Sequence, residues 1–219
     1  MYVRTARVAT AALTTSILLT ACGGSADPSA PQTPAKAVLI EADLPEDWTA
    51  GTAPAQSKSS PADKPECQLL VDLAEGVRPA PAEGGAAGAS FANAVGVSYK
   101  TSVFELGEAD AAGFLKDVES AVGACGAFSV SAEADGGAEA SWLSRAEPLA
   151  AVSAGDGSYG FSVTSTLDSD TSLHMNVVLV RQGGLIATSR SSSIAARPDA
   201  KEFEAFTNLV AKKLTGQAA

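Results

Sequence analysis

The sequence is poor in the residues on which catalytic and metal sites most often depend. It contains one histidine, three cysteines and only 5% aromatic residues among 219 positions. Three cysteines and a single histidine lack the clustered spacing of zinc ligands, so no metal or other cofactor is expected. There is no G-x-S-x-G pattern of a serine nucleophile, and His174 is predicted to be a structural or exposed strand residue. We therefore expect no enzyme and no catalytic residues.

Positive charge is also scarce. The chain has 15 lysine and arginine residues against 25 aspartates and glutamates, which gives a net charge of −10. A surface of this sign is repelled by the phosphates of nucleic acids, so no nucleic-acid partner is expected.

The N-terminus lacks an apolar run of membrane-spanning length. Arg4 and Arg7 precede the uncharged segment Val8–Ala21, whose ~14 residues fall short of the roughly 20 that a spanning helix needs. Positive charge followed by a short apolar segment is typical of a signal peptide. Its end, Leu19–Cys22, reads LTAC and resembles the lipobox of bacterial lipoproteins, in which the cysteine thiol receives a diacylglycerol before cleavage. An ordinary secretory signal followed by an unrelated cysteine is the alternative.

This pattern divides the chain into three parts. Residues 1–21 are the expected signal peptide. Residues 22–36 begin with the lipid-bearing Cys22 and continue as a disordered tether rich in proline, glycine and serine. Residues 37–219 are expected to form a single extracytoplasmic domain that is long enough to bury a hydrophobic core. The expected location is the outer face of the cell membrane, with the lipid on Cys22 as the anchor.

Cysteine pairing follows from the same reasoning. If Cys22 carries lipid, Cys67 and Cys125 remain, and two cysteines in an oxidising compartment are expected to form a disulfide. The bridge would close a loop of about 58 residues and stabilise the fold by roughly 4 kcal/mol in the chain-entropy model. Two separate buried thiols are the alternative.

The spacing of apolar residues predicts the secondary structure, because helices repeat every three or four positions and strands alternate. Predicted helices cover 66–75, 108–122 and 199–214. Predicted strands cover 37–41, 90–106 (as one long strand or two short ones), 127–133, 139–149 and three segments within 158–193. Residues 49–65 and 77–88 are predicted loops. Gly183 and Gly184 predict a two-residue hairpin turn with positive φ at both glycines. Hairpins joining the last strands favour an α+β fold, an antiparallel sheet with a C-terminal meander covered on one face by about three helices.

Two polar segments were candidates for a site. Asp168-Ser169-Asp170 resembles the opening of a calcium loop but lacks the later glycine and glutamate, so a plain turn is expected. The serine-rich Ser189–Ser193 is predicted to be an exposed strand end, where Arg190 is a candidate binding residue.

Several features recur in a known group of proteins. They are the turn Leu44–Trp48, helices bearing Cys67 and Cys125, and a turn at Gly155–Ser158 that enters strands including Val178–Gly183. In these features the chain resembles actinobacterial lipoproteins with a domain similar to the extracellular sensor domain of the kinase PknH. That sensor domain has two disulfides, whereas this chain can form one. The resemblance implies an antiparallel sheet with helices and a small cleft for an unknown cell-envelope ligand, and no functional residue can be carried over.

The expected function is that of a membrane-anchored, non-catalytic sensor or binding domain of the cell envelope. Its expected partners are the membrane, through Cys22, and an unknown envelope ligand or protein. The alternatives are a carrier of a hydrophobic ligand or lipid, a scaffold held by protein contacts, and a hydrolase that uses His174.

Overall fold

The structure is a computed structural model that describes residues 32–51, 59–77, 85–93, 97–133, 139–150, 153–194 and 196–217. The predicted signal peptide, Cys22 and the tether as far as residue 31 lie outside the described residues. The chain from Pro31 to Ala219 forms one compact unit.

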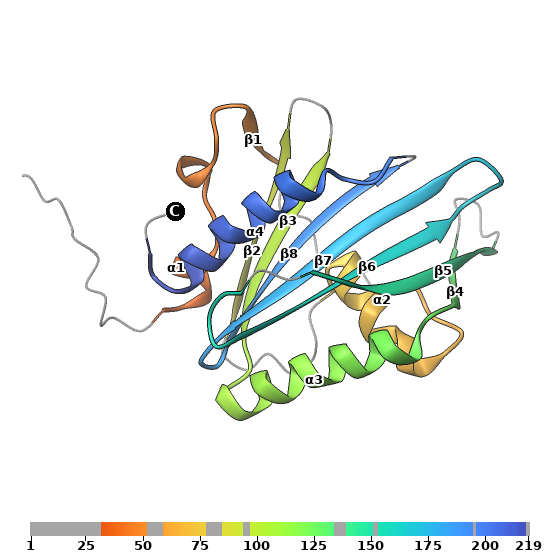
Figure 1. Ribbon diagram of the computed structural model, residues 1–219, viewed down its shortest axis with the longest axis horizontal. Coiled ribbons are helices and arrows are strands. Elements are labelled where there is room, and N and C mark those ends of the chain that lie inside the picture. The colour runs from red at the N-terminus through yellow and green to blue at the C-terminus, as the bar shows by residue number, and fades with distance from the viewer. Residues whose placement is uncertain are drawn as a thin grey trace, which may run out of the picture. The chain divides into compact units, whose positions relative to one another are not determined.

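Eight strands form one sheet in which every pair of neighbours is antiparallel, in the order β1-β2-β3-β8-β7-β6-β5-β4. The strands are β1 (Trp48–Gly51), β2 (Ala86–Asn93), β3 (Ser98–Glu105), β4 (Phe128–Glu133), β5 (Glu139–Leu149), β6 (Gly157–Thr166), β7 (Ser172–Gln182) and β8 (Leu185–Ile194). Strands β6, β7 and β8 form the predicted C-terminal meander (Figure 1). The α+β class and the antiparallel sheet are therefore confirmed.

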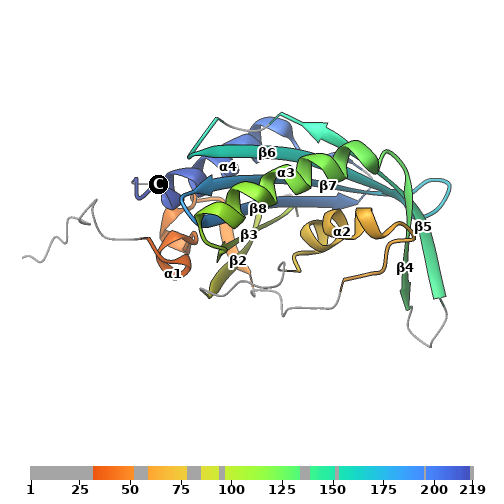
Figure 2. The ribbon, with the colours of Figure 1, turned by 90° about the horizontal axis from the view of Figure 1, so that it is seen from below.

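The helices are divided between the two faces of the sheet. They are α1 (Pro34–Ala37), α2 (Gln68–Glu75), α3 (Glu108–Ala124) and α4 (Ala200–Leu214), with 3₁₀ turns at Glu41–Asp43 and Pro65–Cys67. In β7, Val177 and Leu179 join the core formed with α2 and α3, whereas Val178 and Val180 join the core formed with α1 and α4. Because neighbouring strand residues point to opposite faces, these cores lie on opposite sides, and Figure 2 shows α2 and α4 on either side of β6–β8. The prediction expected helices on one face only. A central strand such as β7, apolar at consecutive positions, needs cover on both faces.

An aromatic cluster fills the core beneath α4. The ring of Trp48 stacks on Tyr99 with centroids 4.3 Å apart, and Phe206 of α4 packs against both rings at 5.5 and 5.2 Å. Asp199 caps α4 by accepting a hydrogen bond from the backbone N–H of Glu202 at 2.9 Å. These contacts explain why the predicted helix 199–214 forms where its apolar stripe suggests.

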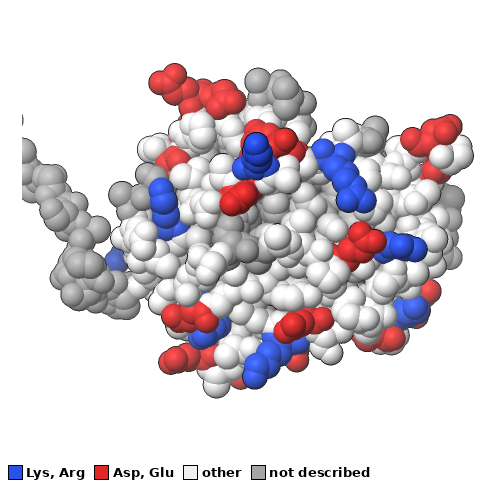
Figure 3. Space-filling model, in the orientation of Figure 1, with Lys and Arg blue, Asp and Glu red and all other residues white. Residues whose placement is uncertain are grey.

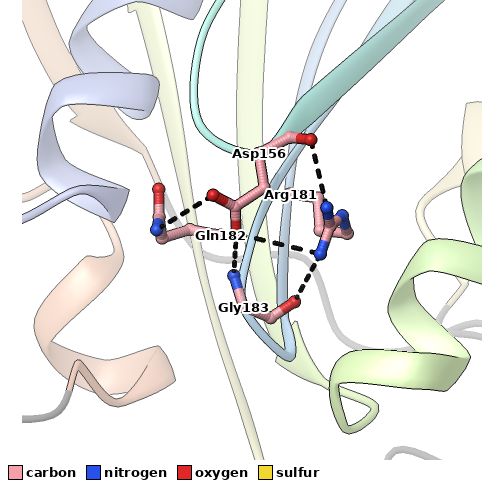
Figure 4. A network of polar contacts seen from close by, with 4 residues as sticks. All are labelled: Asp156, Arg181, Gln182 and Gly183. Atoms are coloured by element: carbon pink, nitrogen blue, oxygen red, sulfur yellow. Dashed lines mark hydrogen bonds and ion pairs between the residues drawn. The ribbon is translucent and has the colours of Figure 1, made fainter.

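The turn between β7 and β8 is held by a second turn that precedes β6. The carboxylate of Asp156 accepts hydrogen bonds from Gly183 N–H at 2.6 Å and from the Gln182 side-chain amide at 3.5 Å (Figure 4). Arg181 donates to the backbone oxygens of Asp156 and Gly183, and its guanidinium lies 3.8 Å from the Asp156 carboxylate.

The two-residue hairpin is confirmed, since Gln182 pairs with Leu185. The prediction for its glycines is half right, because only Gly183 has a positive φ, at 58°. A Cβ on Gly184 would lie 3.0 Å from the backbone of Gly107. Gly184 is thus required for close approach to the chain that enters α3, not for its own backbone conformation.

The predictions for three segments are wrong, namely residues 37–41, 49–65 and 77–88. Residues 37–41, predicted as a strand, run from the end of α1 to the start of a 3₁₀ turn. The predicted loops 49–65 and 77–88 contain β1 and the start of β2, where alanine and glycine pair with neighbouring strands despite low strand propensity. Of the two alternatives for residues 90–106, the structure confirms two strands, which form the hairpin of β2 and β3.

The serine-rich segment of β8 is not an exposed strand end. Ser189 and Ser191 are 0% and 1% exposed, because β8 is paired on both edges and lies between α2 and α4. None of the helices in the described ranges has both the length and the apolar composition of a membrane span.

Candidate ligand-binding cleft

A cleft of ≈ 410 Å³ opens on the α2 side of the sheet. Its floor is formed by β3 and β8, whose register places Lys100 directly opposite Arg190 and Ser98 directly opposite Ser192. These four positions alternate along their strands and so face the same side of the sheet. The volume lies within the roughly 300–1,000 Å³ of typical small-ligand sites.

The walls of the cleft differ in chemistry. Leu173 and Met175 of β7 form an apolar wall, and Ala74 and Glu75 of α2 form the wall across from it. The carboxylate of Glu75 accepts a hydrogen bond from the backbone N–H of Ser60 at 2.9 Å, which holds the loop before α2 against the helix.

The end of α2 makes room for the Arg190 side chain. Gly76 ends the helix in the left-handed conformation, with φ at 88°, and the N–H groups of Gly76 and Val77 both donate to the carbonyl of Asp72. A Cβ on Gly76 would overlap the guanidinium of Arg190. The same glycine therefore serves two purposes, the helix C-cap and the close packing of a cationic side chain.

Arg190 is buried, and no acidic side chain among the described residues forms an ion pair with it. Its side chain is 6% exposed, and its Nε has no hydrogen-bond partner in the part of the chain that the structure describes. The ion pairs found among the described residues join Arg145 to Glu147, Arg181 to Asp156 and Lys213 to Asp43. Neither Arg190 nor Lys100 is in such a pair.

The electrostatics of the two cations reflect this environment. Burial lowers the pKa of Arg190 to about 10, so the guanidinium is still charged at neutral pH. Burial also lowers the pKa of Lys100, and the charge of Arg190 lowers that pKa further. Burying a charge is costly unless a partner offsets it, and two like charges on opposing strand positions repel.

The face of the molecule that carries α4 is different. There, lysine and arginine side chains are interspersed with aspartate and glutamate, and neither sign gathers into one patch (Figure 3). A second hollow on this side, of ≈ 210 Å³, is lined by residues that include Leu149, Val178 and Phe203. It is smaller than the usual range for small-ligand sites.

The structure joins Cys67 and Cys125 in a disulfide with a Cα–Cα distance of 5.7 Å, and both residues are fully buried. The bridge ties the turn before α2 to the end of α3, as the predicted pairing requires. It therefore helps to hold α2, and with it Gly76, beside the cleft. Cys22 lies outside the described residues.

The other candidates from the sequence, His174 and the segment Asp168–Asp170, each contact a nearby polar group. His174 faces the α4 side of the sheet, where its Nδ1 lies 3.4 Å from the Thr164 hydroxyl. Burial and then the charge of Arg197 lower the pKa of His174. In the Asp168–Asp170 segment, the Asp168 carboxylate accepts a hydrogen bond from its own turn, at Asp170 N–H. Within the described residues, no group of three side chains could hold a metal ion.

Arg190 was recognised from the sequence as a candidate binding residue, but Lys100 was not. The alternation in 98–102 placed Lys100 on the polar face of its strand, which is usually a solvated face. A lysine on such a face gives no signal of its own. Only the pairing of β3 with β8 brings it beside Arg190.

The fold is shared with a solved structure. The extracellular domain of PknH from Mycobacterium tuberculosis matches this chain with a TM-score of 0.59 and 11% sequence identity, over 86% of this chain and 99% of that domain. At this identity the likeness shows the fold alone, and at that level the predicted resemblance is confirmed. No protein-family model matches the sequence, and no curated protein sequence matches it.

Proposed function

We propose that this protein is a non-catalytic binding domain of the cell envelope, held on the outer face of the membrane by a lipid on Cys22, and that its ligand occupies the cleft at Arg190. The observation that carries the binding function is the buried Arg190, which forms no ion pair with the described residues and lines a cleft of ligand-sized volume. Three further features support an extracytoplasmic location: the signal-like N-terminus, the Cys67–Cys125 disulfide, and a fold shared with an extracellular domain.

The alternative of a lipid carrier has less support. A carrier needs an apolar cavity large enough to enclose its cargo, whereas the larger hollow contains two cations and a carboxylate. The more apolar hollow, beneath α4, is half that volume. We therefore favour a binding or sensor domain.

The anchor predicts a clear result on cell fractionation. Wild-type protein should be recovered with membranes, and its intact mass should show loss of residues 1–21 and an added lipid. Cys22→Ser should remove the added lipid mass and the membrane association, because the thiol is the attachment point in the lipobox reading. Ser25→Ala, a change of similar size in the same segment, should behave as wild type. Full-length, unmodified protein in the cytosol would contradict the proposal.

The binding function predicts a stabilising ligand. At a 100-fold excess over its Kd, a ligand that binds only the folded state stabilises it by about 2.7 kcal/mol, which for a domain of this size raises Tm by roughly 5–10 °C. A thermal-shift screen of the purified protein with cell-envelope lipids, glycans and their soluble fragments measures this directly. If no compound in the screen shifts Tm, the binding function is contradicted, whatever the state of the anchor.

A further inference from the structure

We propose that the cleft binds an oxyanion, a phosphate or carboxylate group carried on a partly apolar molecule, between Arg190 and Lys100. This inference rests on the binding function proposed above and names the chemical class of its ligand.

The cleft holds two positive charges that the described acidic side chains do not neutralise. Lys100 and Arg190 occupy directly opposed positions on β3 and β8, and no ion pair neutralises either of them within the described ranges. A chain with a net charge of −10 has ample acidic residues with which to pair them. A buried cationic site that the described residues leave without a counter-charge is complementary to a ligand that supplies one.

The floor of the cleft places several hydrogen-bond donors close together. Packing against Gly76 holds the guanidinium of Arg190 in place, and the planar fork of an arginine matches two oxygens of a phosphate or carboxylate. Ser98 and Ser192 lie two positions further along the same two strands and also line the cleft. Two cations and two hydroxyl donors therefore share one small area of the floor.

The remaining walls define the rest of the ligand. Leu173 and Met175 offer an apolar surface next to the cations, so the anionic group should be attached to a hydrocarbon or other apolar body. Glu75, the carboxylate in the lining, is engaged with Ser60 N–H through one oxygen. Its charge disfavours an anion on that side of the cleft and directs the ligand's charged end toward Arg190.

The test uses hexyl phosphate, with hexanol as the neutral probe of the same chain length and inorganic phosphate as the anion without an apolar body. The full-length protein is purified in detergent and titrated calorimetrically. We expect hexyl phosphate to bind at least tenfold more tightly than either of the other probes. Arg190→Gln and Lys100→Gln should each weaken its binding at least tenfold. Lys116→Gln, which removes the same charge from the exposed face of α3, should leave the affinity unchanged.

A second measurement guards against loss of folding in the variants. Without any probe, Arg190→Met should unfold at a higher temperature than wild type, because it removes a buried charge that no described residue neutralises. Lys100 is only partly buried, so Lys100→Gln tests the site without disturbing the core. If Arg190→Met is less stable than wild type in this assay, the guanidinium is already paired in solution and the proposal is overturned.

Vesicles separate the two sources of such an anion, a lipid headgroup and a soluble molecule. With Cys22→Ser protein, flotation that requires Arg190 on phosphatidylglycerol vesicles, and is absent on phosphatidylcholine vesicles, assigns the anion to a headgroup. Binding of hexyl phosphate without such flotation assigns it to a soluble ligand.

The proposal is overturned if hexyl phosphate does not saturate the wild-type protein, or if both charge-neutral variants bind it as wild type does. A neutral compound from the thermal-shift screen that stabilises wild type and both variants equally would overturn the anion site and leave the binding function intact.

Discussion

Replacing both bridge cysteines, Cys67→Ser with Cys125→Ser, should lower the free energy of unfolding by about 4 kcal/mol. The bridge spans 58 positions of the chain, so its loss releases a large loop in the unfolded state. In the folded state both cysteines are 0% exposed and lie in the hydrophobic core. The substitutions would therefore bury two serine hydroxyls in apolar surroundings, which also costs stability. The released loop and the buried hydroxyls both lower the free energy of unfolding.

The effect should be concentrated near the cleft. Helix α2 has only eight residues, and a helix of that length is marginal without tertiary support. Freed from α3, it should move Gly76 away from Arg190 and weaken binding of any ligand in the cleft.

Urea unfolding followed by tryptophan fluorescence measures the change, with Ser120→Ala on the exposed face of α3 as the control. The control should shift stability by less than about 0.5 kcal/mol. A loss below about 1 kcal/mol in the double variant would show that the bridge has little part in stabilising the fold.

Truncating Phe206, which packs on the opposite face of the sheet, should lower the free energy of unfolding by a comparable amount. Phe206→Ala should cost about 3–5 kcal/mol, as for other fully buried aromatic residues. The ring is 0% exposed and contacts Trp48, Tyr99 and Phe91, so its removal leaves a cavity between α4 and the sheet. For a domain of this size the expected fall in Tm is on the order of 10 °C.

Calorimetry of Phe206→Ala and of Asn208→Ala separates packing from helix propensity. Asn208 is exposed on the same helix, and alanine there is a better helix former, so that change should be neutral or slightly stabilising. Binding in the cleft should survive Phe206→Ala at temperatures below its Tm, because α4 lies on the other face of the sheet. If Phe206→Ala lost binding in the cleft as well as thermal stability, the two faces of the sheet would be coupled.

Long, strongly periodic segments were predicted well from the sequence. The helices α3 and α4, the strands of the meander and the turn at Gly183 follow from local spacing alone. Short segments were predicted poorly. The apolar residues 37–41 fit a strand as well as any other buried segment, and the alanine-rich β2 has no strand propensity to reveal it.

The burial of residues 189–191 also escaped prediction, for a different reason. Serine is usually exposed, and nothing local indicates that β8 lies in the middle of an eight-stranded sheet. Its partner β3 lies eighty or more positions away in the chain, far beyond the reach of any local sequence pattern.

The sequence by itself determined the class of fold and the pairing of Cys67 with Cys125, which the structure joins in a disulfide. It also determined the net negative charge and the signal-like N-terminus, from which the lipid anchor is proposed. Each of these depends on residue type and on spacing within a segment. Only the tertiary structure decided which strands are neighbours, how the helices are shared between the two faces, and that Lys100 lies opposite Arg190 beneath Gly76. Those relations join distant parts of the chain, and the burial of apolar surface on both faces selects them where local spacing cannot.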